Sequence, residues 1–345
     1  MKSNFLLIVG FLLLLFTDCM LAAVPLAQAL DIGHNERLLI LAPHPDDETL
    51  GAGGVARRVL EQGGSVRSVV ITAGDAYVGA IQDYLHKRRL TSADYLFYGE
   101  KRLEESRMAA KVLAKGYFLH LDLLGFSDGS IYDMLVKHWQ RQNPDRSEFT
   151  GENHVPYREA EDRGTAQDGQ DLRNELLAIL QDSKPTLIAF PDVMENDSDH
   201  AGLGMFTLLA VHDWLETRNG QHFDPKLLAY LIHWQHGWPP GSDADTAFDW
   251  SDQPLYLPED LPLRGHIRSC LMLTKSEEGL KREALAQYAT QQQAMAPFLA
   301  AFVHTTECFT QLKSADSHGI ENVVKLWQHA RKQFDLHPLT RRKIE

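Results

Sequence analysis

The residues best suited to chemistry lie in a short segment that follows an apolar run. His44, Asp46 and Asp47 come soon after residues 38–42, and a proline flanks the histidine on each side. Because proline cannot continue the hydrogen bonding of a sheet, the apolar run is predicted to be a strand that ends here, with a helix after it. Ligands of open α/β sheets bind beyond the carboxyl ends of the strands, so these side chains are expected at a binding edge.

This segment has the chemistry of a metal site. An imidazole nitrogen of His44 and a carboxylate oxygen of Asp47, three residues later, are both ordinary ligands of zinc. Asp46 lies between them and could take a proton from a water that the metal activates. A third ligand must come from elsewhere in the chain. The alternative is that the two aspartates cap the following helix and that His44 is an ordinary loop residue.

A second acidic, histidine-bearing segment follows another predicted strand. Residues 186–190 form an apolar run, and Asp197 and His200 precede a helix predicted over 201–215. In a parallel sheet His200 would reach the edge that holds the first segment. Two histidines and one carboxylate are the ligands of a catalytic zinc site with an open position. Helix capping by Asp197 and its neighbours is again the alternative.

Asp75 and His233 stand at two further predicted strand ends. Asp75 follows the strand over 66–72, where a turn carboxylate is the commoner interpretation. His233 comes near the end of the strand over 227–234, where a histidine is usually a satisfied core residue. Both are expected on the edge that holds His44.

The helix predicted over 101–115 carries Arg102 and Glu105 on neighbouring positions of one face. A surface ion pair is the plain explanation of the two. Residues 76–100 before this helix are tyrosine-rich and predicted to be irregular, and the polar segment 131–170 is predicted to be a functional loop or lid.

Gly51, Gly53 and Gly54 at the start of the helix over 50–62 suggest close backbone packing. A phosphate-binding loop is the alternative, but the spacing of these glycines matches neither a dinucleotide-binding fingerprint nor a P-loop.

The order of the elements predicts an α/β fold. Strands over 38–42, 66–72, 118–123, 186–190 and 227–234 alternate with helices over 50–62, 101–115, 172–180 and 201–215. Such alternation is typical of a mostly parallel, open sheet with right-handed crossovers and helices on its faces. A loop over 241–264, a helix over 274–293 and further helices from 299 onward complete the chain. We expect one domain over 30–300 and a helical C-terminal extension over 301–345, with a solvated basic tail at 341–343.

Residues 1–29 differ in character from the rest of the chain. A basic residue precedes an apolar run over 5–16, and small residues at 27 and 29 suit a signal peptidase. We expect a secretory signal cleaved after Ala29, and therefore a periplasmic or secreted protein without stable membrane insertion. The alternative is an uncleaved membrane anchor over 5–24, although this span contains an aspartate and its apolar core is short for a bilayer.

The composition is that of an acidic globular protein. The 345 residues carry a formal net charge of −13, which argues against nucleic acid or an anionic membrane surface as the main partner. Two cysteines, Cys270 and Cys308, remain after removal of the signal, and one disulfide between them is possible in an oxidising compartment.

The combination of these motifs resembles the PIG-L/LmbE-type family of zinc-dependent de-N-acetylases. The run from His44 to Glu48 matches the first motif of that family without change, and His200 matches the closing histidine of the second. Looser matches are Arg102, Glu105, Ala109 and Ala110 on one helix and Asp128-Gly129 at a strand end. The resemblance covers roughly residues 36–240.

The resemblance implies a Rossmann-like sheet and a zinc site made of His44, Asp47 and His200, where iron or cobalt could use the same ligands. It implies Asp46 as the general base. It also implies Arg102 as a substrate contact, and Asp75 is expected near the substrate as well. The expected reaction is removal of acetate from an N-acetylated sugar in a glycan, glycolipid or small glycoside.

One position departs from the family pattern. Members usually carry a histidine where this chain has Asp197, and an ionised aspartate cannot donate a hydrogen bond to a developing oxyanion. Asp197 is therefore expected at the substrate, and His233 is the candidate for the missing catalytic donor. Two alternatives stay open: an amidase acting on a thiol conjugate or natural product, and a catalytically silent carbohydrate-binding relic.

Overall fold

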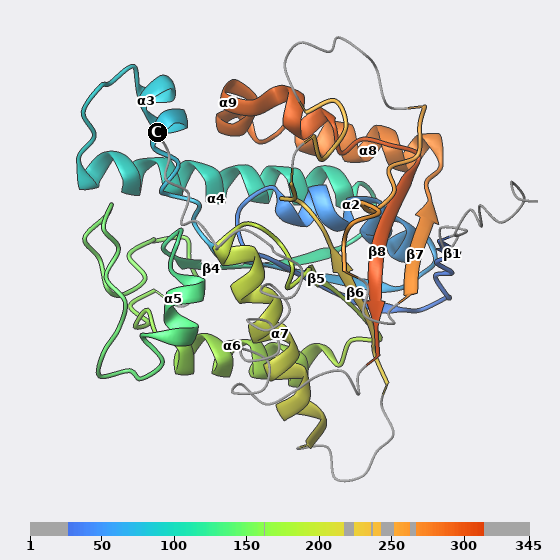
Figure 1. Ribbon diagram of the computed structural model, residues 1–345, viewed down its shortest axis with the longest axis horizontal. Helices are drawn as coiled ribbons and strands as arrows, with labels where there is room; N and C mark the ends of the chain where they lie inside the picture. The colour runs from blue at the N-terminus through green and yellow to red at the C-terminus, as the bar shows by residue number, and fades with distance from the viewer. Residues whose placement is uncertain are drawn as a thin grey trace, which may run out of the picture.

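One mixed sheet forms the centre of the molecule (Figure 1). The computed structural model describes residues 27–161, 163–216, 224–235, 237–242, 252–262 and 267–313. The strands are β1 (Gln28–Ala29), β2 (Arg37–Ala42), β3 (Ser65–Thr72), β4 (Leu119–Phe126), β5 (Leu187–Pro191), β6 (Lys226–Tyr230), β7 (Ile267–Met272) and β8 (Thr306–Leu312). Their order is β1-β7-β8-β6-β5-β2-β3-β4, and every neighbouring pair is parallel except the two that include β8. The expected open, mostly parallel, Rossmann-like sheet is thereby confirmed.

Helices cover both faces of this sheet. They are α2 (Asp47–Glu61), α3 (Val78–Leu85), α4 (Ser92–Ala114), α5 (Ile131–Val136), α6 (Gly169–Ser183), α7 (Ser198–Glu216), α8 (Lys275–Leu285) and α9 (Ala289–Ala300). In Figure 1 α2, α4, α8 and α9 lie on one side of the sheet, and α5, α6 and α7 lie on the other. Successive side chains of a strand point to opposite faces, so Leu39 and Leu41 of β2 enter one core and Leu38 and Ile40 enter the other.

The strand order places a switch point between β2 and β5. From β2 the chain adds β3 and then β4 on one side, whereas β5 and then β6 extend the sheet on the other side. Crossovers that leave in opposite directions open a crevice at the carboxyl ends of the two central strands. His44 follows β2 and His200 follows β5, so the switch point brings the two predicted motifs together.

Several segments differ from their predicted structure. Residues 76–100 are not irregular, since they contain α3 and the first turns of α4, and Ala80 and Ile81 of α3 are buried. The segment 131–170 contains α5 and the start of α6. The single helix expected over 274–293 is two helices, α8 and α9, and β7 was not predicted.

The start of the expected helical extension is a strand. Residues 306–312 form β8, which lies between β6 and β7 and pairs with both in the antiparallel sense. Threonine, cysteine and phenylalanine dominate this segment and suit a buried strand, and the pairing with two neighbours decides its structure. The sheet thus runs past the expected domain boundary at residue 300. Residues 314–345, with the basic tail at 341–343, lie outside the described part.

A disulfide joins the two strands that the sequence did not assign. Cys270 of β7 and Cys308 of β8 are opposite each other in the ladder and are bonded. Gln28 and Ala29 form β1, which pairs with β7, so cleavage after Ala29 stays a prediction that this structure does not test. Among the residues described, none of the helices has the length and apolar character needed to cross a membrane.

Candidate metal centre

His44 and Asp47 meet at the junction of β2 and α2. The turn through the two prolines ends the strand, and Asp47 begins the helix. One carboxylate oxygen of Asp47, Oδ2, lies 3.0 Å from the backbone nitrogen of His44 and 3.1 Å from its ring Nδ1. Both side chains are buried. The turn therefore brings an imidazole and a carboxylate to one point, as the sequence spacing predicted.

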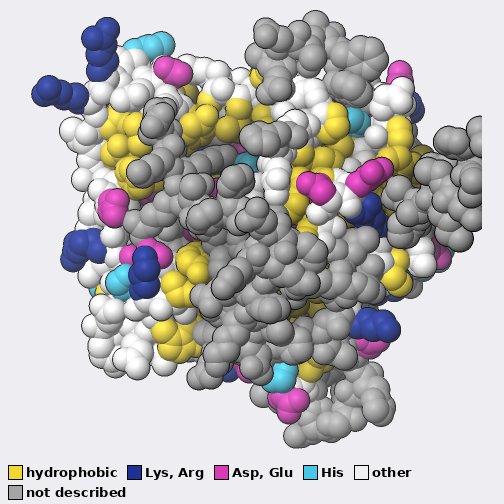
Figure 2. Space-filling view, in the orientation of Figure 1, with side chains coloured by type: hydrophobic (Ala, Val, Ile, Leu, Met, Phe, Trp, Pro, Cys, Tyr) yellow, Lys and Arg dark blue, Asp and Glu magenta, His cyan; other side chains and the backbone are white. Residues whose placement is uncertain are grey.

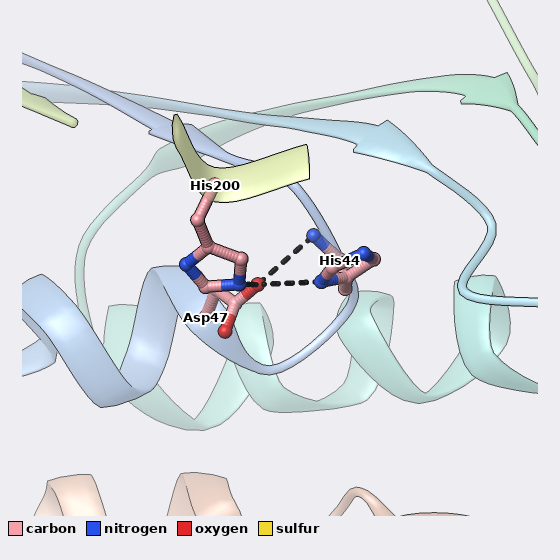
Figure 3. Close-up of side chains that lie close together, drawn as sticks. All are labelled: His44, Asp47 and His200. Atoms are coloured by element: carbon pink, nitrogen blue, oxygen red, sulfur yellow. Dashed lines mark hydrogen bonds and ion pairs between the residues drawn. The ribbon is translucent and has the colours of Figure 1, made fainter. Parts of the chain in front are cut away.

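His200 completes the group from the first turn of α7. Its Nε2 lies 3.1 Å from Asp47 Oδ2, and its ring centre lies 5.3 Å from that of His44 (Figure 3). One donor atom from each of the three residues lies within 4.8 Å of the other two. His200 is fully buried, and within the described residues neither ring nitrogen meets hydrogen-bond geometry. A buried imidazole left in this way beside a carboxylate and a second imidazole fits a divalent metal.

Electrostatics favour a positive charge at this point. Burial lowers the pKa of His200, but the Asp47 and Glu195 carboxylates outweigh burial and raise that pKa to about 10. Burial likewise lowers the pKa of His44, and there Asp128 leads the carboxylates that raise it well above its usual value. A cation bound between the two rings meets the same surplus of negative charge.

Each histidine also has a carboxylate on its far side. His44 Nε2 lies 3.2 Å from Asp128 Oδ1 and 3.5 Å from Asp199 Oδ2. His200 Nδ1 lies 3.5 Å from Glu195 Oε1. Such carboxylates fix the ring orientation of metal-binding histidines. Sequence reasoning missed Glu195, whose only signal is its place in the acidic run before His200.

Asp199 holds the turn that carries Asp128. The Asp199 carboxylate accepts hydrogen bonds from the Gly129 and Ile131 amides, at 2.7 and 2.9 Å. These contacts join α7 to the turn after β4. His44, Asp128 and Asp199 form a second group of donors close enough for a cation, which shares His44 with the first group.

Asp46 has an unusual backbone conformation. Its φ of 112° is rare for a residue other than glycine, and no side-chain hydrogen bond of Asp46 caps α2, so the capping alternative is wrong for this residue. Its amide donates to Glu48 Oε2 at 3.0 Å, and Tyr288 Oη donates to the other Glu48 oxygen at 2.6 Å. Burial raises the pKa of Asp46 to about 8, although the Arg102 guanidinium opposes it. The chain thus holds a strained, buried carboxyl beside the candidate metal ligands.

Arg102 lies behind Asp46 in the interior. Its guanidinium donates to the carbonyls of Pro45 and Gly74, at 2.6 and 2.9 Å, and lies 3.3 Å from Asp46 Oδ2. A Cβ at Gly74, where φ is +61°, would lie 2.0 Å from Nη1 of Arg102, so this approach requires glycine. Arg102 and Glu105 are both buried, and the surface ion pair suggested as an alternative is therefore wrong. Contact between Arg102 and substrate stays a prediction.

The two predicted substrate aspartates differ in position. Asp75 is buried and accepts from the Asp128 amide at 2.9 Å and from the Tyr157 hydroxyl, so it supports Asp128, and its contact with substrate stays a prediction. Asp197 Oδ1 accepts from the Asp199 amide at 2.9 Å, so helix capping is correct for Asp197. Asp197 also lines the cavity described below, and its contact with substrate stays a prediction.

His233 lies just after β6 and next to His200. Its ring centre is 4.7 Å from that of His200, and its ring stacks on Phe298 at 5.6 Å. Its amide donates to Glu195 Oε2 at 2.6 Å. The structure thus brings His233 to the candidate centre, and its catalytic role stays a prediction.

A cavity of about 470 Å³ opens beside Asp128 and Asp199. Its other described lining residues are Ala76, Tyr77, Val78, Gly129, Asp145, Arg146, Ser147, Glu148, Phe149, Asp197 and Ser198. Residues 145–149 belong to the segment 131–170, which therefore contributes a wall of the cavity. This size suits a small-molecule site.

The fold and these side chains define an α/β protein with a candidate site for a divalent metal at the switch point of its sheet. The chain belongs to the PIG-L family: the family model described as GlcNAc-PI de-N-acetylase matches residues 39–211. It is accordingly a deacetylase of that family. The resemblance noted from the sequence motifs is confirmed. No curated protein matches the chain.

Solved structures of deacetylases resemble the chain over most of its length. The A40926 pseudoaglycone deacetylase Dbv21 is 17% identical, with a TM-score of 0.47 over 76% of this chain and 85% of that one. The N,N'-diacetylchitobiose deacetylase from Pyrococcus horikoshii is 17% identical, with a TM-score of 0.46 over 82% and 86%. A triple mutant of the deacetylase of teicoplanin biosynthesis is 14% identical, with a TM-score of 0.49 over 81% and 100%.

Proposed function

We propose that this protein removes the acetyl group from an N-acetylated amino sugar and that zinc is its metal. The observation that carries the proposal is the buried group of His44, Asp47 and His200, whose donor atoms lie within 4.8 Å of one another beside Asp46. The family description, which names a GlcNAc-bearing lipid, supports the sugar. Zinc held by these three residues would supply a Lewis acid that activates water and polarises a carbonyl.

Asp46 acts as general base and then as general acid. Its carboxylate takes a proton as water attacks the acetamide carbonyl, and it returns that proton to the leaving nitrogen. The C–N bond breaks, and the products are acetate and a free amine. The Glu48 side chain and the Arg102 guanidinium hold Asp46 in its strained conformation, so the base is in place before substrate binds.

The remaining polar side chains orient the histidines or contact the substrate. Glu195 orients His200, and Asp128 and Asp199 orient His44. Protonated His233 donates to the developing oxyanion in place of the family histidine that Asp197 replaces. The cavity beside Asp128 takes the sugar, with the Tyr77 and Phe149 rings in its wall.

Export of the protein is a further part of the proposal. The basic and apolar pattern of residues 1–29 supports it. The Cys270–Cys308 disulfide supports it independently, because disulfides persist mainly in oxidising compartments. Sequencing the amino terminus of the mature protein tests this part, since a chain that begins at Leu30 excludes an uncleaved anchor.

The deciding experiment measures metal content and acetate release together. Purified wild type is expected to hold about one zinc per chain and to release acetate from N-acetylglucosamine oligomers. Asp46→Asn is expected to keep its zinc and lose at least about a hundredfold in rate, in keeping with loss of a general base. Asp182→Asn, at an exposed position on α6, serves as the control and should match wild type.

Two outcomes would contradict the proposal. Folded protein without metal would refute the metal site. Zinc without acetate release from any acetylated sugar would favour an amidase on another conjugate or a silent binding protein.

A further inference from the structure

Helix α2, which begins at the ligand Asp47, is broken after its first turn. Ala52 has φ −145° and ψ 18°, outside the helical region, so a short first segment is followed by a separate helix body. Breaks of this kind leave backbone groups without their partners in the helix. Here the first segment carries Asp47 and Glu48, and both of these side chains belong to the candidate site.

Two charged side chains from the far end of the chain fill the break. Lys281 Nζ, from α8, donates to the Leu50 carbonyl at 2.8 Å. Glu307, from β8, accepts from the Gly54 and Val55 amides at 2.7 and 2.8 Å. Lys281 and Glu307 also form an ion pair of 2.7 Å, and both are buried.

The pair stands where one helical hydrogen bond would be. In a regular α-helix the Gly54 amide donates to the Leu50 carbonyl. Here the Gly54 amide donates to the carboxylate of Glu307 instead, and the Leu50 carbonyl accepts from the ammonium of Lys281. The charges suit the helix dipole. The Glu307 carboxylate contacts the amino-terminal end of the helix body, and the Lys281 ammonium contacts the carboxyl-terminal end of the short first segment.

The packing around the break leaves little freedom. A Cβ at Gly54 would lie 2.5 Å from Leu273 and 3.0 Å from Glu307, and a Cβ at Gly51 would lie 2.6 Å from the Tyr230 ring. The glycines therefore serve close packing, as the sequence suggested. With Glu307 on the Gly54 and Val55 amides, the phosphate-loop alternative has lost two of its donors.

We infer that Lys281 and Glu307 are positioning residues for the metal ligand Asp47. The break separates the ligand-bearing turn from the helix body, and the ion pair joins the two across the break through Leu50 on one side and Gly54 on the other. This inference rests on the proposed metal site. Both residues lie beyond the segment 39–211 that matches the family model.

The test uses as its control another buried charge pair on α2, which joins the helix body to α8 away from the break. Arg58, in the body of α2, donates to Glu277 of α8 at 2.8 Å, so Arg58→Met also leaves a buried carboxylate without its cationic partner. Zinc affinity is measured by competition with a chelator, and thermal unfolding is measured on the metal-free proteins. Lys281→Met and Glu307→Gln are expected to weaken zinc binding about tenfold or more. Arg58→Met should lower the unfolding temperature yet bind zinc within about twofold of wild type.

Three results would overturn the inference. One is wild-type zinc affinity in folded Lys281→Met and Glu307→Gln. Another is an equal loss of affinity in Arg58→Met, which would mean that general destabilisation is the cause. If wild type itself binds no zinc, the metal site fails and the inference fails with it, which separates the two proposals.

A measurement on wild type covers the case in which the single variants do not fold. Zinc should slow hydrogen exchange of the amides at residues 53–56 more than that of the amides at 59–61, because binding and ordering of the break are coupled. The double variant Lys281→Met/Glu307→Gln, which removes both charges, should show the weakened affinity as well. If zinc leaves the hydrogen exchange of the amides at residues 53–56 unchanged, metal binding and ordering of the break are not coupled, and the inference is refuted.

Discussion

Glu195 is buried between His200 and the amides of Ile232 and His233. It can therefore both fix the orientation of the His200 ring and add negative charge to the candidate metal centre. Glu195→Gln keeps the shape but removes the charge, so zinc affinity is expected to fall by about 10- to 100-fold. Glu216→Gln, at the exposed opposite end of α7, is the control in the same zinc titration. Equal affinities of the two variants would mean that Glu195 has no such role.

Asp75 makes the stability of the fold depend on pH. Burial raises the pKa of its carboxyl from 3.8 to about 7, although hydrogen bonds from Tyr157 and Asp128 oppose the shift. The folded protein therefore keeps this proton longer than the unfolded chain does. The stability that the protonated form contributes is complete below about pH 4 and is lost as pH rises to about 7.

The variant Asp75→Asn isolates this effect. The unfolding free energy of wild type minus that of the variant should fall by about 4 kcal/mol between about pH 4 and pH 8 and then stay level, at about 1.4 kcal/mol per pKa unit. Urea unfolding of the two metal-free proteins at a series of pH values between about pH 4 and pH 8 measures this difference in free energy. A difference that is constant with pH would show that Asp75 is ionised throughout.

At the scale of elements, Gln167 joins the segment 131–170 to the sheet. Its Oε1 accepts from the buried Ser127 amide at 2.8 Å, and its Nε2 donates to the Glu152 carbonyl at 3.1 Å. Gln167→Ala leaves that amide unpaired and should cost about 1–3 kcal/mol of stability. Because residues 145–149 line the cavity, KM should rise more than kcat falls.

The control for this prediction is Gln170→Ala, an exposed position three residues later on α6. Steady-state kinetics and urea unfolding of both variants decide the matter. If Gln167→Ala loses stability with KM unchanged, the segment 131–170 has no part in substrate binding.

The sequence predicts elements well where the signal is local. The prolines around His44 mark the end of β2, and the alternation of strands and helices up to residue 216 predicts the parallel sheet. Together these place His44, Asp47 and His200 at one edge, and the structure brings them together there. The C-terminal strands β7 and β8 escaped prediction because their pairing with each other and with β6 decides their structure.

Supporting contacts were the hardest to foresee. Glu307 and Gly54 are 253 residues apart, and nothing near either residue signals the other. The same holds for Tyr288 and Glu48, 240 residues apart. Arg102 and Asp75 were foreseen near the site, but only the fold shows that both are buried behind it.

At the scale of the whole molecule, charge is expected to select the substrate. The chain carries a net charge of −13, and five of the described cavity residues are acidic (Asp128, Asp145, Glu148, Asp197, Asp199), against one arginine. On the face shown in Figure 2 most of the visible Lys and Arg side chains lie toward the margin. Such a field disfavours anionic ligands.

Neutral N-acetylglucosamine oligomers should therefore react with a kcat/KM about tenfold above that of a phosphorylated analogue. Raising the salt concentration from about 0.05 to about 0.5 M should lower the ratio of these two kcat/KM values toward one, because salt screens the cavity charges. Glu148→Gln, which removes one exposed charge from the cavity wall, should lower this ratio as well. A ratio near one at low salt would contradict the prediction.

The place of β8 in the sheet has a consequence for biosynthesis. This strand is the last one described along the chain, yet it lies between β6 and β7 and joins the β1–β7 pair to the rest of the sheet. A nascent chain therefore has every proposed ligand long before it can close its sheet. Until the ribosome has released residues 306–312, Glu307 cannot reach the break in α2. The break in α2 can therefore be filled only after β8 has been made, and closure over such long separations in sequence is intrinsically slow.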